Sequence, residues 1–176
     1  MKLRFNQHTK VWYRYIRDYI RFIGQQVLKP EERNIRLHFV FFPKEIERFD
    51  LTDKYANTIV NYTPYLGMVY CDMYFNVPKI YKYQDNNITR IDRILENIFY
   101  HEYRHYQQFK NIEILYHLED IDDIDNKIDS VTEVLEKDAD NYARMILDEN
   151  KEIPIGVIHG VVRKILKSSY NKNIKV

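Results

Sequence analysis

The sequence predicts an α+β fold, in which a small sheet accompanies several long helices. Residues 35–42 and 66–76 alternate between two kinds of side chain, a pattern typical of strands. Residues 88–109 and 131–147 instead place apolar side chains three and four positions apart, which is typical of amphipathic helices. A group of strands followed by a group of helices is characteristic of the α+β class.

The first third of the chain is expected to form a helix and then strands. A helix is predicted over about residues 9–28, because Pro30 cannot continue it. The alternating strand over 35–42 is closed by Pro43, and weaker strand signals follow around 58–62.

The strand over residues 66–76 has two interpretations. It is a candidate edge strand, onto which an extended peptide could pair through backbone hydrogen bonds. An ordinary strand inside the sheet is an equal alternative. The two helices over 88–109 and 131–147 follow, and a last amphipathic helix is expected near 155–168.

Length and composition predict one domain over residues 1–176, with its core at about 35–155. The hydrophobic content of 45% is enough to fill such a core. The single cysteine, Cys71, excludes an internal disulfide and suits a reducing cytoplasm. Since the sequence has neither the apolar run of a signal peptide nor that of a membrane span, we expect a cytoplasmic protein.

Residues 101–105 read His-Glu-Tyr-Arg-His and have the form HExxH. On a helix His101 and His105 project from the same face, so that both imidazoles can reach one metal ion. Glu102 can then take the proton of a water molecule at that ion. These residue types at this spacing predict a zinc site.

A catalytic zinc site needs a third protein ligand, and the helix over 131–147 offers one. Glu136 is predicted to be that ligand, and Glu133, one turn earlier, competes with it. Asp140 shares a face with Glu136 and could accept a hydrogen bond from the non-ligating nitrogen of a zinc histidine. The alternative is that Glu136 and Asp140 belong to a solvated acidic face.

The segments HEYRHYQQF and EKDADNYARMIL together resemble the gluzincin branch of the zinc metallopeptidases. Within that branch they are most similar to the small ImmA/IrrE-type peptidases of phages and mobile elements. The resemblance implies a zincin-like domain, with a small mixed or antiparallel sheet packed on the HExxH helix and a second helix bearing Glu136. Asp140 stands where that family has Asn, and Tyr142 where it has Phe.

The expected activity is therefore hydrolysis of a peptide bond, with Zn²⁺ held by His101, His105 and Glu136. Glu102 would accept the proton of the attacking water and later pass it to the leaving amine. A further group should stabilise the oxyanion, and the sequence leaves four candidates: Tyr62, Tyr70, Tyr142 and His159. The resemblance suggests a protein substrate, such as a regulatory protein, that is cut once rather than digested.

Charge is balanced overall, with a formal net charge of +1, but it is segregated along the chain. The acidic stretch over 119–125 is expected to be a solvated connection between the ligand helices.

In the first helix, Trp12 and Tyr13 lie among basic residues such as Arg14, which is consistent with a rival function. That rival is a module that binds nucleic acid or a membrane surface, with a structural or inactive zinc site. Inward packing of the aromatic residues is the simpler interpretation, so the sequence favours a protein substrate over nucleic acid.

Overall fold

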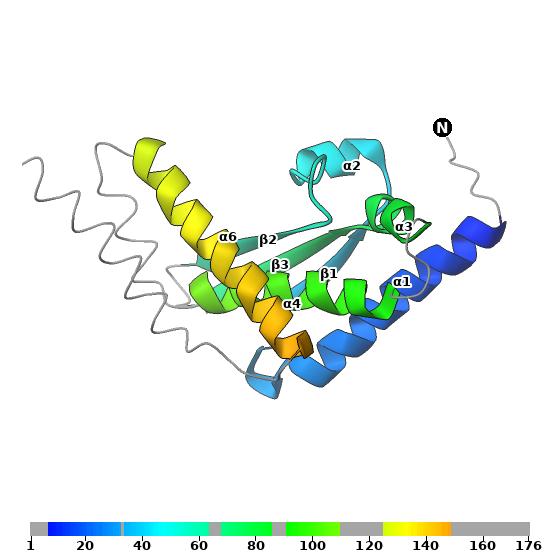
Figure 1. Cartoon of the computed structure of the whole chain (residues 1–176), viewed down its shortest axis with the longest axis horizontal. Coiled ribbons are helices and arrows are strands. Elements are labelled where there is room, and N and C mark those ends of the chain that lie inside the picture. The colour runs from blue at the N-terminus through cyan, green and yellow to red at the C-terminus, as the bar shows by residue number, and fades with distance from the viewer. Residues whose placement is uncertain (1–6, 33, 64–67, 86–90, 110–124, 149–176) are drawn as a thin grey trace, which may run out of the picture. The chain divides into compact units, whose positions relative to one another are not determined.

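The structure is a computed structural model, and it describes residues 7–32, 34–63, 68–85, 91–109 and 125–148. The chain divides into two compact units, Met1–Glu102 and Tyr103–Val176, and the division falls inside helix α4 (Ile91–Phe109) (Figure 1). The predicted organisation as one domain stays a prediction.

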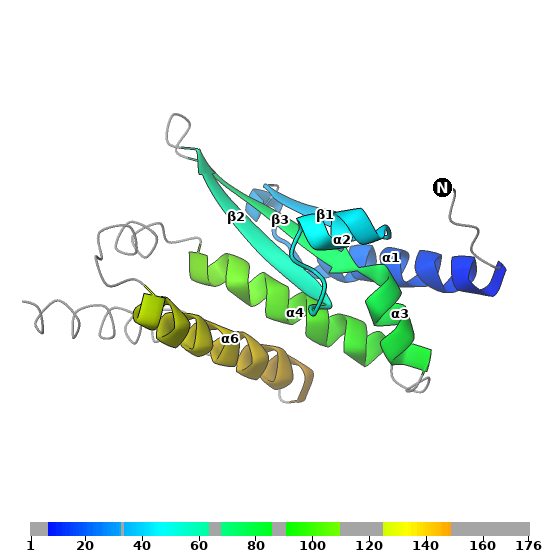
Figure 2. The same cartoon turned by 90° about the horizontal axis from the view of Figure 1, so that it is seen from above.

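A three-stranded mixed sheet forms the centre of the first unit. Its strands are β1 (Ile35–Val40), β2 (Ala56–Thr63) and β3 (Met68–Asn76), in the order β1-β3-β2. β3 pairs with β1 in parallel and with β2 in antiparallel orientation. Figure 2 shows the three strands side by side. The α+β class is confirmed, and the three predicted strands form.

β3 lies in the middle of the sheet, so the prediction of an edge strand at residues 66–76 is wrong. Cys71, for example, is aligned with Ile35 on one side and with Val60 on the other. The alternation of side chains reports on the two faces of a strand, whereas its position depends on which strands pair with its two backbone edges. In the described sheet an added strand could pair only with β1 or β2.

Helix α1 (Gln7–Val27) packs on one face of this sheet, and the predicted N-terminal helix is confirmed. Its buried stripe consists of Ile16, Ile20 and Ile23. Gly24 allows a close approach, because a Cβ at this position would lie 3.1 Å from Leu37 Cδ1 and 3.6 Å from the Phe99 ring. The Tyr19 hydroxyl donates a hydrogen bond to the Glu96 carboxylate at 2.9 Å. These contacts join α1 to β1 and to the first part of α4.

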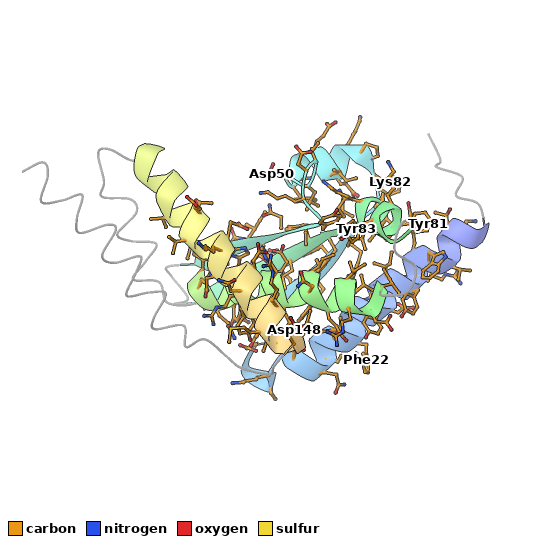
Figure 3. All side chains as sticks on the ribbon, viewed as in Figure 1. Phe22, Asp50, Tyr81, Lys82, Tyr83 and Asp148 are labelled. Carbon is orange, nitrogen blue, oxygen red and sulfur yellow. The ribbon has the colours of Figure 1, made fainter. Side chains whose placement is uncertain are left out.

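The opposite face of α1 is exposed and basic. Its exposed side chains include Val11, Arg14 and Phe22. The exposed Arg21 instead places its guanidinium 5.3 Å from the ring centroid of Phe39 in β1. Figure 3 shows Phe22 on the side of α1 that is turned away from the sheet. Tyr13 instead packs against Phe41 and Tyr81, with ring centroids 5.7 and 5.6 Å away. The aromatic residues of α1 are thus divided between packed and exposed positions.

Two short helices that were not predicted follow the strands. α2 (Pro43–Arg48) begins at the proline that was expected only to close β1, since the fixed φ of proline also suits the first turn of a helix. α3 (Val77–Asp85) begins after Asn76, whose side-chain oxygen accepts a hydrogen bond from the Lys79 backbone N–H at 3.1 Å. Asn76 is therefore the N-cap of α3.

The second unit contains, in its described part, the end of α4 from Tyr103 onward and helix α6 (Asp125–Asp148). The buried stripe of α6 consists of Val131, Leu135, Asp138, Ala139, Tyr142 and Ala143. The spacing of three and four residues confirms the helix predicted over 131–147, which begins earlier, at Asp125. The acid within this apolar stripe, Asp138, pairs with Arg104 of α4 at 2.8 Å.

Two predicted segments lie outside the described residues. They are the C-terminal helix near 155–168 and the acidic connection over 119–125, apart from Asp125 itself. Of the helices that the structure describes, none has the length and apolar character needed to cross a membrane.

Candidate metal centre

The HExxH residues lie well inside helix α4, as the sequence predicts. His101 and His105 are one helical turn apart and therefore share a face. His101 is half-buried, whereas Glu102 and His105 are buried. Because Glu102 directly follows His101, its side chain leaves the helix about 100° away from that of His101.

The structure brings the three predicted ligands together. His101, His105 and Glu136 each offer one ligand atom, and these atoms lie within 4.8 Å of one another. The Nε2 atom of His105 is 3.4 Å from Oε1 of Glu136. Two atoms that bind a tetrahedral zinc at about 2.0–2.1 Å lie about 3.4 Å from each other.

The set fits zinc in donor chemistry as well as in spacing. Two imidazoles and one carboxylate are an established ligand combination of catalytic zinc. The side chain of Glu136 is 55% exposed, so it can rotate the short distance that a tighter set requires.

Glu102, the predicted proton acceptor, is held by the sheet. Thr58 of β2 lies 2.6 Å from the Glu102 carboxylate through its hydroxyl oxygen, and 3.2 Å from the Glu102 backbone carbonyl. A hydroxyl has one hydrogen to donate, and the shorter distance assigns it to the carboxylate. Thr58 thus fixes one carboxylate oxygen of Glu102.

His105 has a second partner on its own helix. Its Nδ1 atom lies 2.8 Å from the side-chain oxygen of Gln108, which is completely buried. The Gln108 amide nitrogen donates to the Leu135 carbonyl at 2.9 Å and to the Asp138 carboxylate at 2.8 Å. Arg104 also donates to Asp138, through Nε at 2.8 Å and Nη2 at 3.3 Å.

Sequence reasoning missed Thr58, Gln108 and Asp138. The sequence contains a weak indication of the role of Gln108, because Gln108 lies three residues after His105 and so one turn away on the same helix. A second indication is Asp138, which is an acid within the apolar stripe of α6. The sequence contains no indication of the role of Thr58, because its contact with Glu102 joins residues that are 44 positions apart.

The other predicted site residues have different outcomes. Asp140 is exposed on α6, one turn after Glu136, and its predicted role beside a zinc histidine stays a prediction. Among the described residues, the possible ligand group contains Glu136 and not the competing Glu133.

The choice of an oxyanion-stabilising residue stays open. Tyr142 is buried, with the Arg104 guanidinium 4.7 Å from its ring centroid. Tyr70 is half-buried in β3. The side chain of Tyr62 and the whole of His159 lie outside the part of the chain that the structure describes.

A separate polar cluster joins β1 and β3. The Asp72 carboxylate, which is buried, accepts a hydrogen bond from Arg36 at 2.7 Å and lies 2.6 Å from Nε2 of His38. The His38 ring stacks on Tyr74, with centroids 4.6 Å apart. The buried Asp72 carboxylate is thus paired with the Arg36 guanidinium. None of the residues of this cluster is a candidate metal ligand.

Comparison of the chain with protein-family models, with curated proteins and with solved structures found no match. The arguments for function therefore come from the residues of this chain and their geometry.

Proposed function

We propose that the protein is a zinc-dependent metallopeptidase that hydrolyses peptide bonds. The observation that carries the proposal is the convergence of His101, His105 and Glu136, whose ligand atoms lie within 4.8 Å of one another. HExxH words can occur by chance, and the position of the Glu136 carboxylate, on a second helix and 3.4 Å from His105, supports a metal site over a chance word. The resemblance to gluzincins, carried by HEYRHYQQF and EKDADNYARMIL, supports the same assignment.

In the proposed reaction each residue of the chain has a separate task. When bound, zinc would polarise the scissile carbonyl and lower the pKa of a water molecule toward about 7. Glu102 accepts the proton of the attacking water and delivers it to the leaving amine. Thr58 holds the Glu102 carboxylate in one orientation, through the hydrogen bond at 2.6 Å.

The proposed substrate is an extended segment of a protein or peptide. In the described sheet β2 has a partner on one side, β3, which leaves its other backbone edge able to pair with an added strand. β2 also contributes Thr58, which contacts Glu102, so a strand added there would run beside the proton acceptor. The resemblance to ImmA/IrrE-type peptidases supports limited cleavage of a regulatory protein over general digestion.

The metal site is tested by zinc content, measured by inductively coupled plasma mass spectrometry. We expect about one zinc per wild-type chain, and a large loss of zinc on the substitution Glu136→Ala. The matched control is Glu133→Ala, on the same helix and also exposed, which should keep the metal. A wild-type chain that takes up no zinc, or equal zinc loss in both variants, would contradict the proposed ligand set.

The activity is tested by incubating the protein with a peptide library and identifying new termini by mass spectrometry. The substitution Glu102→Gln should abolish cleavage while zinc stays bound, because the amide cannot accept the water proton. The control Glu133→Gln should cleave like the wild type. Cleavage by Glu102→Gln at the wild-type rate would refute the assigned role of Glu102.

The exposed face of α1 supports a second candidate function, a binding module with a structural or inactive zinc site. Exposed Phe22 and Val11, together with exposed Arg14, offer both apolar and cationic contacts. The same experiments separate the two candidates. Zinc uptake without any cleavage, together with salt-sensitive binding to nucleic acid or to anionic vesicles, would favour the binding module.

A further inference from the structure

The hydrogen bonds of Gln108 determine the orientation of its amide group. Its nitrogen lies 2.9 Å from the Leu135 carbonyl oxygen and 2.8 Å from the Asp138 carboxylate. Both are acceptors, so they require the NH₂ end of the amide and use both of its hydrogens. The carbonyl end of the amide must then face His105, where Oε1 lies 2.8 Å from Nδ1. An inverted amide would oppose an oxygen to two acceptors in a buried place, which is unfavourable.

This orientation determines the tautomer of His105. An amide oxygen can only accept, so Nδ1 of His105 must carry a hydrogen. A neutral imidazole has one N–H, and Nε2 is consequently the nitrogen with the lone pair. That atom lies 3.4 Å from Glu136 Oε1, on the side of the candidate metal ligands. His105 is therefore prepared to bind a metal through Nε2.

Gln108 is itself held by a buried ion pair. The side chains of Arg104 and Asp138 are only 3% and 1% exposed, and they share two hydrogen bonds. Arg104 also donates to Gln107 at 3.2 Å. Burying two charges costs several kcal/mol of solvation per ion, so such a pair is weak evidence for added stability. What the pair does supply is a fixed acceptor for the Gln108 amide.

We infer that Gln108 is a positioning residue, which holds His105 as the Nδ1–H tautomer with Nε2 directed at the metal, and that Asp138 and Arg104 fix Gln108. The part that concerns the metal rests on the proposed function, whereas the tautomer is a property of the metal-free chain. Partners of this kind orient metal-ligating histidines, and their loss weakens metal affinity by about 10–100-fold.

The first experiment reads the tautomer without any metal. In ¹⁵N-labelled, metal-free protein at about pH 8, most histidine side chains are neutral, and correlation spectra distinguish the two ring nitrogens. The His105 signals are identified by their absence in His105→Gln. We expect Nδ1–H in the wild type and a shift toward Nε2–H in Gln108→Leu. Nε2–H as the main form in the wild type would overturn the inference.

The second experiment measures zinc affinity by competition with a chelator. Gln108→Leu should bind zinc about 10–100-fold more weakly than the wild type. The matched control is Gln26→Leu, the same substitution at an exposed position of α1, which should keep the wild-type affinity. A folded Gln108→Leu variant with unchanged affinity and an unchanged tautomer would also overturn the inference.

A double variant distinguishes the loss of these specific hydrogen bonds from general misfolding. Gln108→Glu alone keeps an acceptor for His105 but places a carboxylate oxygen against both the Asp138 carboxylate and the Leu135 carbonyl. Adding Asp138→Asn removes the repulsion between the two carboxylates and supplies an NH₂ group again. Gln108→Glu/Asp138→Asn should therefore show more of the Nδ1–H tautomer and bind zinc more tightly than Gln108→Glu alone. Failure of this recovery in a folded double variant would count against the inference. If the wild type shows Nδ1–H but binds no zinc, the proposed function fails and the tautomer assignment stands.

Discussion

Thr58 shows how a single hydroxyl can orient the proposed proton acceptor. Its hydrogen bond to Glu102 is 2.6 Å long and joins β2 to α4 within the first unit. A hydrogen bond to a charged group contributes about 1.5–3 kcal/mol, which is more than a neutral pair contributes.

We expect Thr58→Val to lower kcat by roughly tenfold with little change in KM, since the loss concerns the orientation of a catalytic group and not substrate binding. Valine has almost the same shape as threonine, so the strand should stay intact. Thr58→Ser keeps the hydroxyl and is the matched control. Steady-state kinetics on a cleaved library peptide, with zinc content measured in parallel, would test this. Equal kcat values for Thr58→Val and Thr58→Ser would exclude the positioning role.

At the scale of residues, the sequence reveals the ligands better than their supports. His101 and His105 are four positions apart on one helix, so their shared face follows from helix geometry alone. Glu136 could be proposed because zinc chemistry demands a third ligand. The hydrogen bond between Gln108 and Asp138 joins residues 30 positions apart, and it depends on the register of two helices that no local pattern encodes.

At the scale of elements, patterns of side chains predicted which segments are helices and strands but not where each strand lies in the sheet. The alternation in residues 66–76 predicts a strand, and β3 (Met68–Asn76) forms there, yet β3 is central because β1 and β2 pair with its two edges. The short helices α2 and α3 were missed for a different reason. Pro43 predicts the end of a strand, but the fixed φ of proline equally favours the first turn of a helix, which is what forms.

The packing of α1 depends on the absence of a side chain at Gly24. A Cβ at this position would already lie 3.1 Å from Leu37 Cδ1, and the Phe99 ring is 3.6 Å away. Larger side chains would therefore push α1 away from β1 and from the first part of α4.

We expect Gly24→Val to lower the free energy of unfolding by about 1–3 kcal/mol, which is typical of overpacking in a buried place. Gly24→Ala is the matched control and should be close to neutral. Its gain in helix propensity, about 1 kcal/mol, opposes a tight contact with the flexible end of Leu37. Urea denaturation followed by circular dichroism measures both variants. A Gly24→Val protein as stable as the wild type would contradict the close packing of α1.

At the scale of the whole molecule, several buried or bonded groups bind their protons more tightly in the folded state. Burial raises the pKa of the Cys71 thiol, and the charges of Asp72 and Glu102 add to the effect. Burial, and then a hydrogen bond to Asp92, raises the pKa of Tyr15 to about 12. Burial and a hydrogen bond to Glu96 raise the pKa of Tyr19 in the same way. In an unfolded chain a thiol titrates near pH 8.5 and a phenol near pH 10, to a rough approximation.

These shifts predict that alkaline pH destabilises the protein in two stages. Below about pH 8.5 the thiol and both phenols are protonated in the folded and the unfolded chain, so their stabilising effect is fully present. As pH rises further, the unfolded chain loses the Cys71 proton first and the tyrosine protons above about pH 10, whereas the folded chain keeps them. The free energy of unfolding should therefore fall with pH, until the pH passes the folded-state values, about 12 for Tyr15.

Cys71→Ala separates the two stages, because it removes the thiol and leaves both tyrosines. Urea denaturation at a series of pH values between about 7 and 10.5 should show parallel curves below roughly pH 8 and a gentler decline for Cys71→Ala than for the wild type at every pH above about 8.5, because the unfolded wild type has lost the thiol proton that the folded wild type keeps. The substitution also leaves a small cavity in β3, which lowers stability at every pH by the same amount and does not change the slope. Parallel curves over the whole pH range would show that the Cys71 thiol titrates alike in the folded and unfolded chains, and would exclude the close burial of this strand in solution.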